Sequence, residues 1–333
     1  MKNYFKFNLA GKTVFPVWII FMVLFLIPYG VLQYKIQGIK GPASDPQETM
    51  NRLKGMFELY GVMAFLILVE YGFFFFFIKL ALEGIEFKEK SLKFAGKFGQ
   101  YLLVLIPGFL LTIITIGIYS PWYLAGLYNF FAKKTSHNDD NFEFKGQGGE
   151  LFLITLFTVI LPMIFVFFVI MVFAFVAGFK GAAGNPTPTP LITFYAILIV
   201  SLVIILMTPY LYYSYKWKVD FKVKNYSIRW ETSFWSSVGK IAVEVLLSLI
   251  TIGIYAPLAT LKLYKFFSER TIANSPSKTL QFGYDIEPKD DFVFIWKEIL
   301  LTVVTLGIYY PWAACNVVDL IIGKTYLKEI EAE

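Results

Sequence analysis

Three glutamates lie inside long apolar stretches of the sequence, and they are the residues most able to do chemistry there. They are Glu70, Glu244 and Glu298. A carboxylate at membrane depth is costly, so such residues commonly line an ion or proton path. Glu244 and Glu298 each stand nine residues before the glycine of a recurring motif, where a first copy of the motif has Gly108. A coupling-ion site between repeats is therefore one interpretation.

Local pairing near the membrane surface is the competing interpretation for two of these glutamates. Glu244 lies one helical turn after Lys240, and Glu298 directly follows Lys297. Glu70 has no charged neighbour nearer than Glu58 and Lys79. Glu70 is thus the residue for which a functional role is most favoured.

Most other site chemistry is excluded by composition. Cys315 is the single cysteine and His137 the single histidine, so neither an internal disulfide nor a Cys/His metal or haem site can form. His137 lies in a polar loop without a Ser/His/Asp arrangement, and no glycine-rich phosphate-binding loop is present. We therefore expect no catalytic, cofactor-binding or metal-binding residues, and no enzyme.

Composition indicates a membrane protein. Of the 333 residues, 57% are hydrophobic and only 16% are charged, and the apolar residues are grouped in blocks. Each block is close to the roughly 20 residues that cross a bilayer as a helix. We therefore expect an all-α polytopic protein with about seven long spans. The blocks are residues 16–34, 57–78, 99–119, 151–178, 191–214, 234–256 and 291–312.

The motif T-[IL]-G-I-Y-x-P occurs three times. A glycine tolerates unusual backbone angles, and a proline cannot donate to a helix ladder, so each motif predicts a helix break. Spacing between the copies predicts a tandem repeat with boundaries 1–136 and 137–272 and a partial third copy at 273–333. The motif residues are Gly117, Tyr119 and Pro121, then Gly253, Tyr255 and Pro257, then Gly307, Tyr309 and Pro311.

A short helix is expected after each motif, giving three in all. Such a helix either returns toward the side it came from or lies flat in the interface. Copies in the same orientation need an even number of crossings, and lysine-rich segments at 80–97, 134–149, 216–232 and 270–290 favour the returning form with a cytoplasmic N-terminus. The period-two pattern at 141–146 and 219–223 predicts short strands at the membrane surface.

The sequence resembles the YjgN-like family of bacterial inner-membrane proteins in three features. These are the motif, the segment Phe142–Phe152, and a threonine 18 residues after each motif glycine: Thr135, Thr271 and Thr325. The likeness covers roughly residues 80–333. Leu258 departs from it where the other copies have Trp122 and Trp312. The resemblance implies a helical inner-membrane protein, and because the family is one of unknown function it implies no substrate or catalytic residue.

Two functions are compatible with these features. One is transport of a small solute, ion or lipid along a path between repeats, favoured by the intramembrane acids. The other is a structural or assembly role that organises lipid or partner proteins, favoured by the lack of a polar stripe. The net charge of +6 fits anionic lipid headgroups as partners, whereas nucleic acid is not expected because the cations are spread over many loops.

Overall fold

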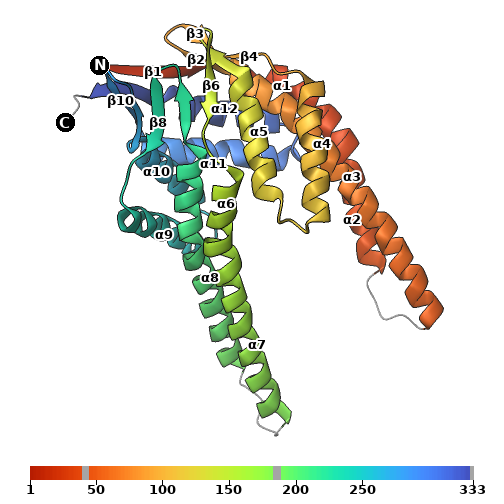
Figure 1. The fold of residues 1–333 in the computed structure, drawn as a ribbon. Helices are drawn as coiled ribbons and strands as arrows, with labels where there is room; N and C mark the ends of the chain where they lie inside the picture. Colours follow the sequence, from red (N-terminus) through yellow and green to blue (C-terminus); the bar gives the residue numbers. More distant parts are fainter. Residues whose placement is uncertain (40–44, 183–188, 331–333) are drawn as a thin grey trace. The chain divides into compact units, whose positions relative to one another are not determined.

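The computed structural model describes residues 1–39, 45–182 and 189–330 (Figure 1). The chain forms two compact units. Unit 1 comprises residues 1–2, 143–292 and 326–333, and unit 2 comprises residues 3–142 and 293–325. Each unit contains pairs of packed helices. Short strands precede or follow these helices in the chain.

Four helices are long and apolar enough to cross a membrane within the described residues. They are Gly11–Gln37, Pro46–Gly84, Gly148–Phe179 and Ile197–Lys218. In unit 2, α1 (Gly11–Phe21), a π-helical turn η1 (Met22–Leu26) and α2 (Ile27–Ile39) pair with α3 (Pro46–Gly84). In unit 1, α6 (Gly148–Thr155), η2 (Leu156–Ile160) and α7 (Leu161–Ala182) pair with α8 (Thr189–Lys218).

Both π-helical turns precede a helix whose second residue is proline, Pro28 in α2 and Pro162 in α7. A proline has no amide hydrogen, so it cannot donate to the carbonyl four residues earlier. The helix ladder is therefore interrupted one turn before each proline, which is where a wider turn is tolerated.

The expected seven long spans are wrong. The blocks at 99–119, 234–256 and 291–312 each contain a motif, and the helix in each block ends there. The resulting helices α4 (Phe98–Ile114), α9 (Phe234–Ile250) and α11 (Pro288–Val304) have 17 residues each. At 1.5 Å per residue they extend about 25 Å, less than a hydrocarbon core of about 30 Å.

Each of these helices folds back on a shorter one, forming a helical hairpin. The shorter helices are α5 (Ser120–Lys134), α10 (Ala256–Ser268) and α12 (Tyr310–Gly323). Figure 1 shows α4 and α5 side by side, joined by a tight turn.

The all-α assignment is also wrong, because the described part of the chain contains eleven strands. In unit 2, β1 (Lys2–Phe7), β2 (Ile85–Phe87) and β3 (Lys90–Ser91) pair antiparallel, as do β4 (Lys93–Phe94), β5 (Thr135–His137) and β6 (Asp140–Phe144). In unit 1, β7 (Phe221–Val223), β8 (Tyr226–Trp230), β9 (Thr271–Asn274) and β10 (Thr279–Tyr284) form an antiparallel meander, with β11 (Thr325–Ile330) beside β10. Strands of two to six residues are too short to dominate the composition, so the apolar blocks favoured an all-α class although short strands were expected at two places.

Register follows the alternation of the sequence. Phe5 faces Phe87 across β1 and β2 with ring centroids 4.6 Å apart, while Lys6 faces Glu86. Cross-strand pairs of this kind stabilise a sheet by roughly 0.2–1 kcal/mol each. The strands near 141–146 and 219–223 form where the period-two pattern indicated.

Candidate functional site

The turn at each motif is built the same way in all three hairpins. The motif glycines Gly117, Gly253 and Gly307 have φ of +89°, +83° and +86°, in the left-handed region that favours glycine. The glycine amide donates to a carbonyl five residues earlier, at 2.7–2.8 Å, closing the end of the first helix. Each motif proline then lies in the first turn of the next helix, where its missing amide costs nothing.

Threonines at equivalent positions of the three motifs complete each hairpin at both ends. The hydroxyl of Thr115 accepts from the amide of Tyr119 at 3.0 Å, and Thr251 and Thr305 make the equivalent contacts. Thr135, Thr271 and Thr325 donate to the carbonyl four residues earlier, where the second helix turns into a strand. The threonine 18 residues after each glycine is therefore explained by this helix-to-strand junction.

The tips of the hairpins carry strained and exposed aliphatic residues. Ile116, Ile252 and Leu306 have φ of +51°, +52° and +50°, an unfavourable conformation for a bulky or β-branched residue. Their side chains are 94%, 93% and 85% exposed, so packing within the protein does not offset the strain. Aliphatic residues flank them two positions away on either side and are exposed too: Ile114, Ile118, Ile250, Ile254, Val304 and Ile308.

Glu244 lies at the centre of a polar chain between α9 and α10. One carboxylate oxygen accepts from Lys240 Nζ at 2.6 Å, and the other accepts from the Tyr255 hydroxyl at 2.8 Å. Lys262 Nζ donates to the same hydroxyl at 2.8 Å. The Glu244 side chain is only 2% exposed, whereas that of Lys240 is 37% exposed. The chain therefore connects a buried carboxylate to the hairpin surface through two lysines and a tyrosine.

Glu298 lies in the corresponding place between α11 and α12, with neutral partners. It is 1% exposed, and its carboxylate accepts from Asn316 Nδ2 at 3.0 Å, with Tyr309 nearby. Asn316 and Lys262 each stand nine residues after the motif glycine, mirroring the glutamates nine residues before it. The two glutamates are thus held inside their own hairpins.

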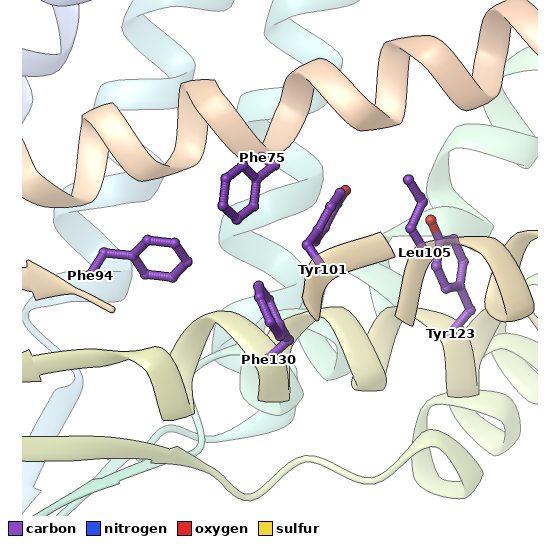
Figure 2. Close-up of a cluster of buried hydrophobic side chains, with 6 residues drawn as sticks. All are labelled: Phe75, Phe94, Tyr101, Leu105, Tyr123 and Phe130. Atoms are coloured by element: carbon purple, nitrogen blue, oxygen red, sulfur yellow. The ribbon is translucent and has the colours of Figure 1, made fainter. Parts of the chain in front are cut away.

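In the α4–α5 hairpin, an aromatic ring occupies the space that the glutamate occupies in the other two hairpins. Gly108 replaces the glutamate, and Tyr123, six residues after the motif glycine, replaces an alanine, Ala259 or Ala313. A Cβ at Gly108 would lie 2.1 Å from Tyr123 Cδ2. Figure 2 shows Tyr123 in a hydrophobic cluster with Tyr101, Leu105 and Phe130 of the α4–α5 hairpin, Phe75 of α3 and Phe94 of β4.

This exchange of a large residue for a small one predicts coupled substitutions. Gly108→Gln alone should destabilise the fold by a few kcal/mol through overlap with the ring. Tyr123→Ala alone should cost about 3–5 kcal/mol by leaving a cavity. The double variant resembles the other hairpins and should be at least about 1 kcal/mol more stable than the sum of the two effects. Thermal unfolding in detergent measures this, and additive effects would contradict it.

Comparison with known proteins identifies the family. The family of bacterial proteins of unknown function DUF898 matches residues 94–287, more than half of the chain. The chain belongs to the DUF898 family. Inner membrane protein YjgN of Salmonella typhimurium (strain LT2) is 35% identical over 74 residues, which is 22% of this chain. The match spans only 19% of that relative, and no solved structure matches.

The resemblance stated from the motifs is confirmed by this match. The DUF898 match includes the α4–α5 and α9–α10 hairpins completely, and with them Lys240, Glu244, Tyr255 and Lys262. Glu70, Glu298 and Gly307 lie outside it. The Lys240 partner of Glu244 was expected from the sequence. Tyr255, Lys262 and Asn316 were missed, although the mirrored spacing of nine residues could have indicated Lys262 and Asn316. The hydrogen bond to Glu298 comes from Asn316, in place of the expected pairing with Lys297.

The remaining candidates have less defined surroundings. Glu70 is half-buried in α3 and has no hydrogen bond or ion pair with the described part of this DUF898 protein. Its orientation toward a polar interior stays a prediction. His137 lies on β5 with Nε2 3.1 Å from the Phe87 carbonyl oxygen, and Cys315 is buried. Neither residue lies in a cluster of three or more metal-ligating groups within the described residues.

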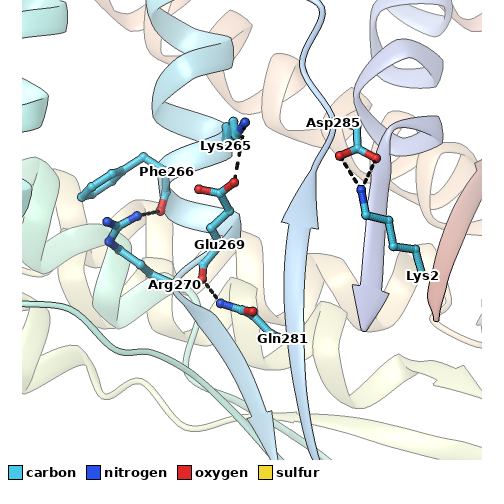
Figure 3. A network of polar contacts seen from close by, with 7 residues as sticks. All are labelled: Lys2, Lys265, Phe266, Glu269, Arg270, Gln281 and Asp285. Atoms are coloured by element: carbon cyan, nitrogen blue, oxygen red, sulfur yellow. Dashed lines mark hydrogen bonds and ion pairs between the residues drawn. The ribbon is translucent and has the colours of Figure 1, made fainter. Parts of the chain in front are cut away.

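The end of the α9–α10 hairpin opposite its tip is polar. Figure 3 shows Lys265 paired with Glu269 at 3.7 Å and Arg270 donating to the Phe266 carbonyl, beside the strands. Gln281 on β10 donates to the Glu269 carbonyl, and Lys2 binds both carboxylate oxygens of Asp285 at 2.7–2.8 Å. The α9–α10 hairpin is therefore charged at the end near the strands and aliphatic at its tip.

Proposed function

We propose that this protein is an inner-membrane protein that organises the lipid bilayer by inserting three short helical hairpins, without catalysing a reaction. The inner-membrane location is supported by the name of the Salmonella relative and by the four long apolar helices. The observation that carries the proposal is the hairpin tip, where strained aliphatic side chains have no protein contact to stabilise them.

Lipid is the environment that offsets this strain. Burial of an isoleucine or leucine side chain is worth about 1.5–3 kcal/mol, and a left-handed residue costs roughly 1–2 kcal/mol. Three such residues at each tip support insertion of the tip itself into the hydrocarbon. A helix lying flat in the interface would instead bury one face along its length. The returning form of the short helices is thus the better supported alternative.

Both helices of each hairpin continue into strands, so the strand-bearing ends lie on one side of the membrane and the tips dip in from there. We place the strands and the N-terminus in the cytoplasm. Exposed lysines among the strands and turns, such as Lys88, Lys90 and Lys93, support this side. Anionic lipid headgroups of the inner leaflet are then natural partners.

Site-specific fluorescence should separate the tips from the strands. In a Cys315→Ser background, a polarity-sensitive dye on Ile254→Cys should emit in the blue and be quenched by lipids spin-labelled on their acyl chains. The same dye on Lys90→Cys should be quenched by aqueous iodide and only from the cytoplasmic side. Iodide quenching of the tip site, or periplasmic labelling of residue 90, would contradict the arrangement.

Transport along a polar path is the second candidate, favoured by the buried chain from Lys240 through Glu244 and Tyr255 to Lys262. It is less supported because Glu244 and Glu298 are each paired within their own hairpin. Reconstituted vesicles distinguish the two functions. Lipid organisation predicts a dose-dependent change in acyl-chain order without ion flux. A proton or cation flux that Glu244→Gln abolishes would overturn it in favour of transport.

A further inference from the structure

We propose that Lys240 and Lys262 of the α9–α10 hairpin bind the phosphodiester of an anionic phospholipid. This rests on the proposed function, because the hairpin must lie in the bilayer. The network has two ammonium groups and one carboxylate, so it keeps one uncompensated positive charge. The Tyr255 hydroxyl between them is neutral.

Both lysines have donors to spare. An ammonium group has three N–H donors. Lys240 uses one on Glu244, and Lys262 uses one on the Tyr255 hydroxyl while lying 5.2 Å from the centroid of the same ring. Across residues 1–39, 45–182 and 189–330, neither lysine has a further hydrogen bond or ion pair. Both lysines are half-buried, so an acceptor from outside the chain would satisfy their remaining N–H donors.

The position of the lysines along the hairpin suits a headgroup. Trp235, in the first turn of α9, is exposed on the hairpin surface, as expected of an aromatic residue at the membrane interface. Lys240 lies five residues further toward the tip, about 7.5 Å along the axis. Basic groups between helices at this depth recognise lipid phosphates in general.

The other two hairpins offer an internal comparison. In place of Lys240 they have Val104 and Phe294, and in place of Lys262 they have Gly126 and Asn316. These replacements carry no charge, so the α9–α10 hairpin is the one of the three with two cations around the polar position. Lipid binding at this hairpin is therefore a specialisation within a shared turn geometry.

Native mass spectrometry of the full-length protein in detergent tests the site. Titration with phosphatidylglycerol should show binding at least tenfold tighter than with phosphatidylcholine. Lys240→Gln with Lys262→Gln should weaken phosphatidylglycerol binding about tenfold and leave phosphatidylcholine unchanged. Lys240→Arg with Lys262→Arg keeps both charges and should retain binding. Lys297→Gln, an exposed lysine beside Glu298, is the matched control and should have no effect.

Three results would overturn the site. The first is equal loss with Lys297→Gln, which would indicate nonspecific charge. The second is unchanged phosphatidylglycerol binding in the double glutamine variant. The third is equal competition by inorganic phosphate or glycerol 3-phosphate, which would make the ligand a soluble phosphate. The tip fluorescence at residue 254 is independent of these outcomes, so failure of the site is distinguishable from failure of hairpin insertion.

Discussion

Gly11→Leu should expose Cys315 to thiol reagents roughly a hundred times more readily than in the native protein. Gly11 is the first residue of α1 and lies against α12, where a Cβ would be 2.6 Å from Trp312 Cα and 2.7 Å from its Cγ. Because the nearest atom belongs to the backbone, a side-chain rotation cannot relieve the overlap. We expect a cost of about 3 kcal/mol, a little over two factors of ten in the opening equilibrium.

Cys315 reports on the same contact. It is the single cysteine of the chain, it is buried, and it packs with Phe7 and Val14 of the β1–α1 segment. Separation of α1 from α12 therefore uncovers it directly. The labelling rate with a maleimide dye in detergent measures the effect. Gly30→Leu is the control, since no atom lies within 4 Å of a Cβ there. Equal rates for the two variants would show that the α1–α12 contact is dispensable.

Replacing Ile116, Ile252 and Leu306 together by glycine should have opposite effects on folding and on lipid. Each substitution relieves a left-handed conformation, so the stability of the protein in detergent should rise by about 1 kcal/mol per site. Each also removes a side chain that buries about 1.5–3 kcal/mol in hydrocarbon. The three together should cost the hairpins about 5 kcal/mol or more of insertion free energy.

Two measurements on the same variant separate these effects. The thermal midpoint in detergent should rise, while the dye at residue 254 should lose its acyl-chain quenching and vesicles should lose the change in lipid order. Gly253→Ala is the opposing control, because it adds left-handed strain and meets no atom within 4 Å. A variant with unchanged tip insertion would show that the aliphatic residues are not what holds the tips in the bilayer.

Much of the fold follows from backbone chemistry within a few residues of the chain. The positive φ at Gly117, Gly253 and Gly307 and the prolines that follow are backbone properties, so the helix breaks could be read from the motif. Period-two alternation indicated the strands near residues 141–146 and 219–223. The number of spans could not be read this way, because hydropathy measures apolar length and does not distinguish a crossing helix from two arms of a hairpin.

Only part of the polar site around Glu244 could be predicted from the sequence. Glu244 and Lys240 are one turn apart on a single helix, so their 2.6 Å ion pair follows from helical spacing. Tyr255 reaches the same carboxylate, and Lys262 reaches the Tyr255 hydroxyl, only after the motif reverses the chain. Likewise, the replacement of a glutamate by Tyr123 in the first hairpin depends on how closely α5 approaches Gly108.

The sequence by itself determined the membrane class, the three breaks and the residues that form them, since these depend on composition and on backbone chemistry within a few residues. Only the tertiary structure decided that the apolar blocks around the motifs hold 17-residue helices in place of full spans. It also decided that both repeat-related glutamates are paired inside the hairpins, and that Ile116, Ile252 and Leu306 are exposed at the tips. These properties depend on which faces of two helices meet, and on which side chains remain uncovered when they do.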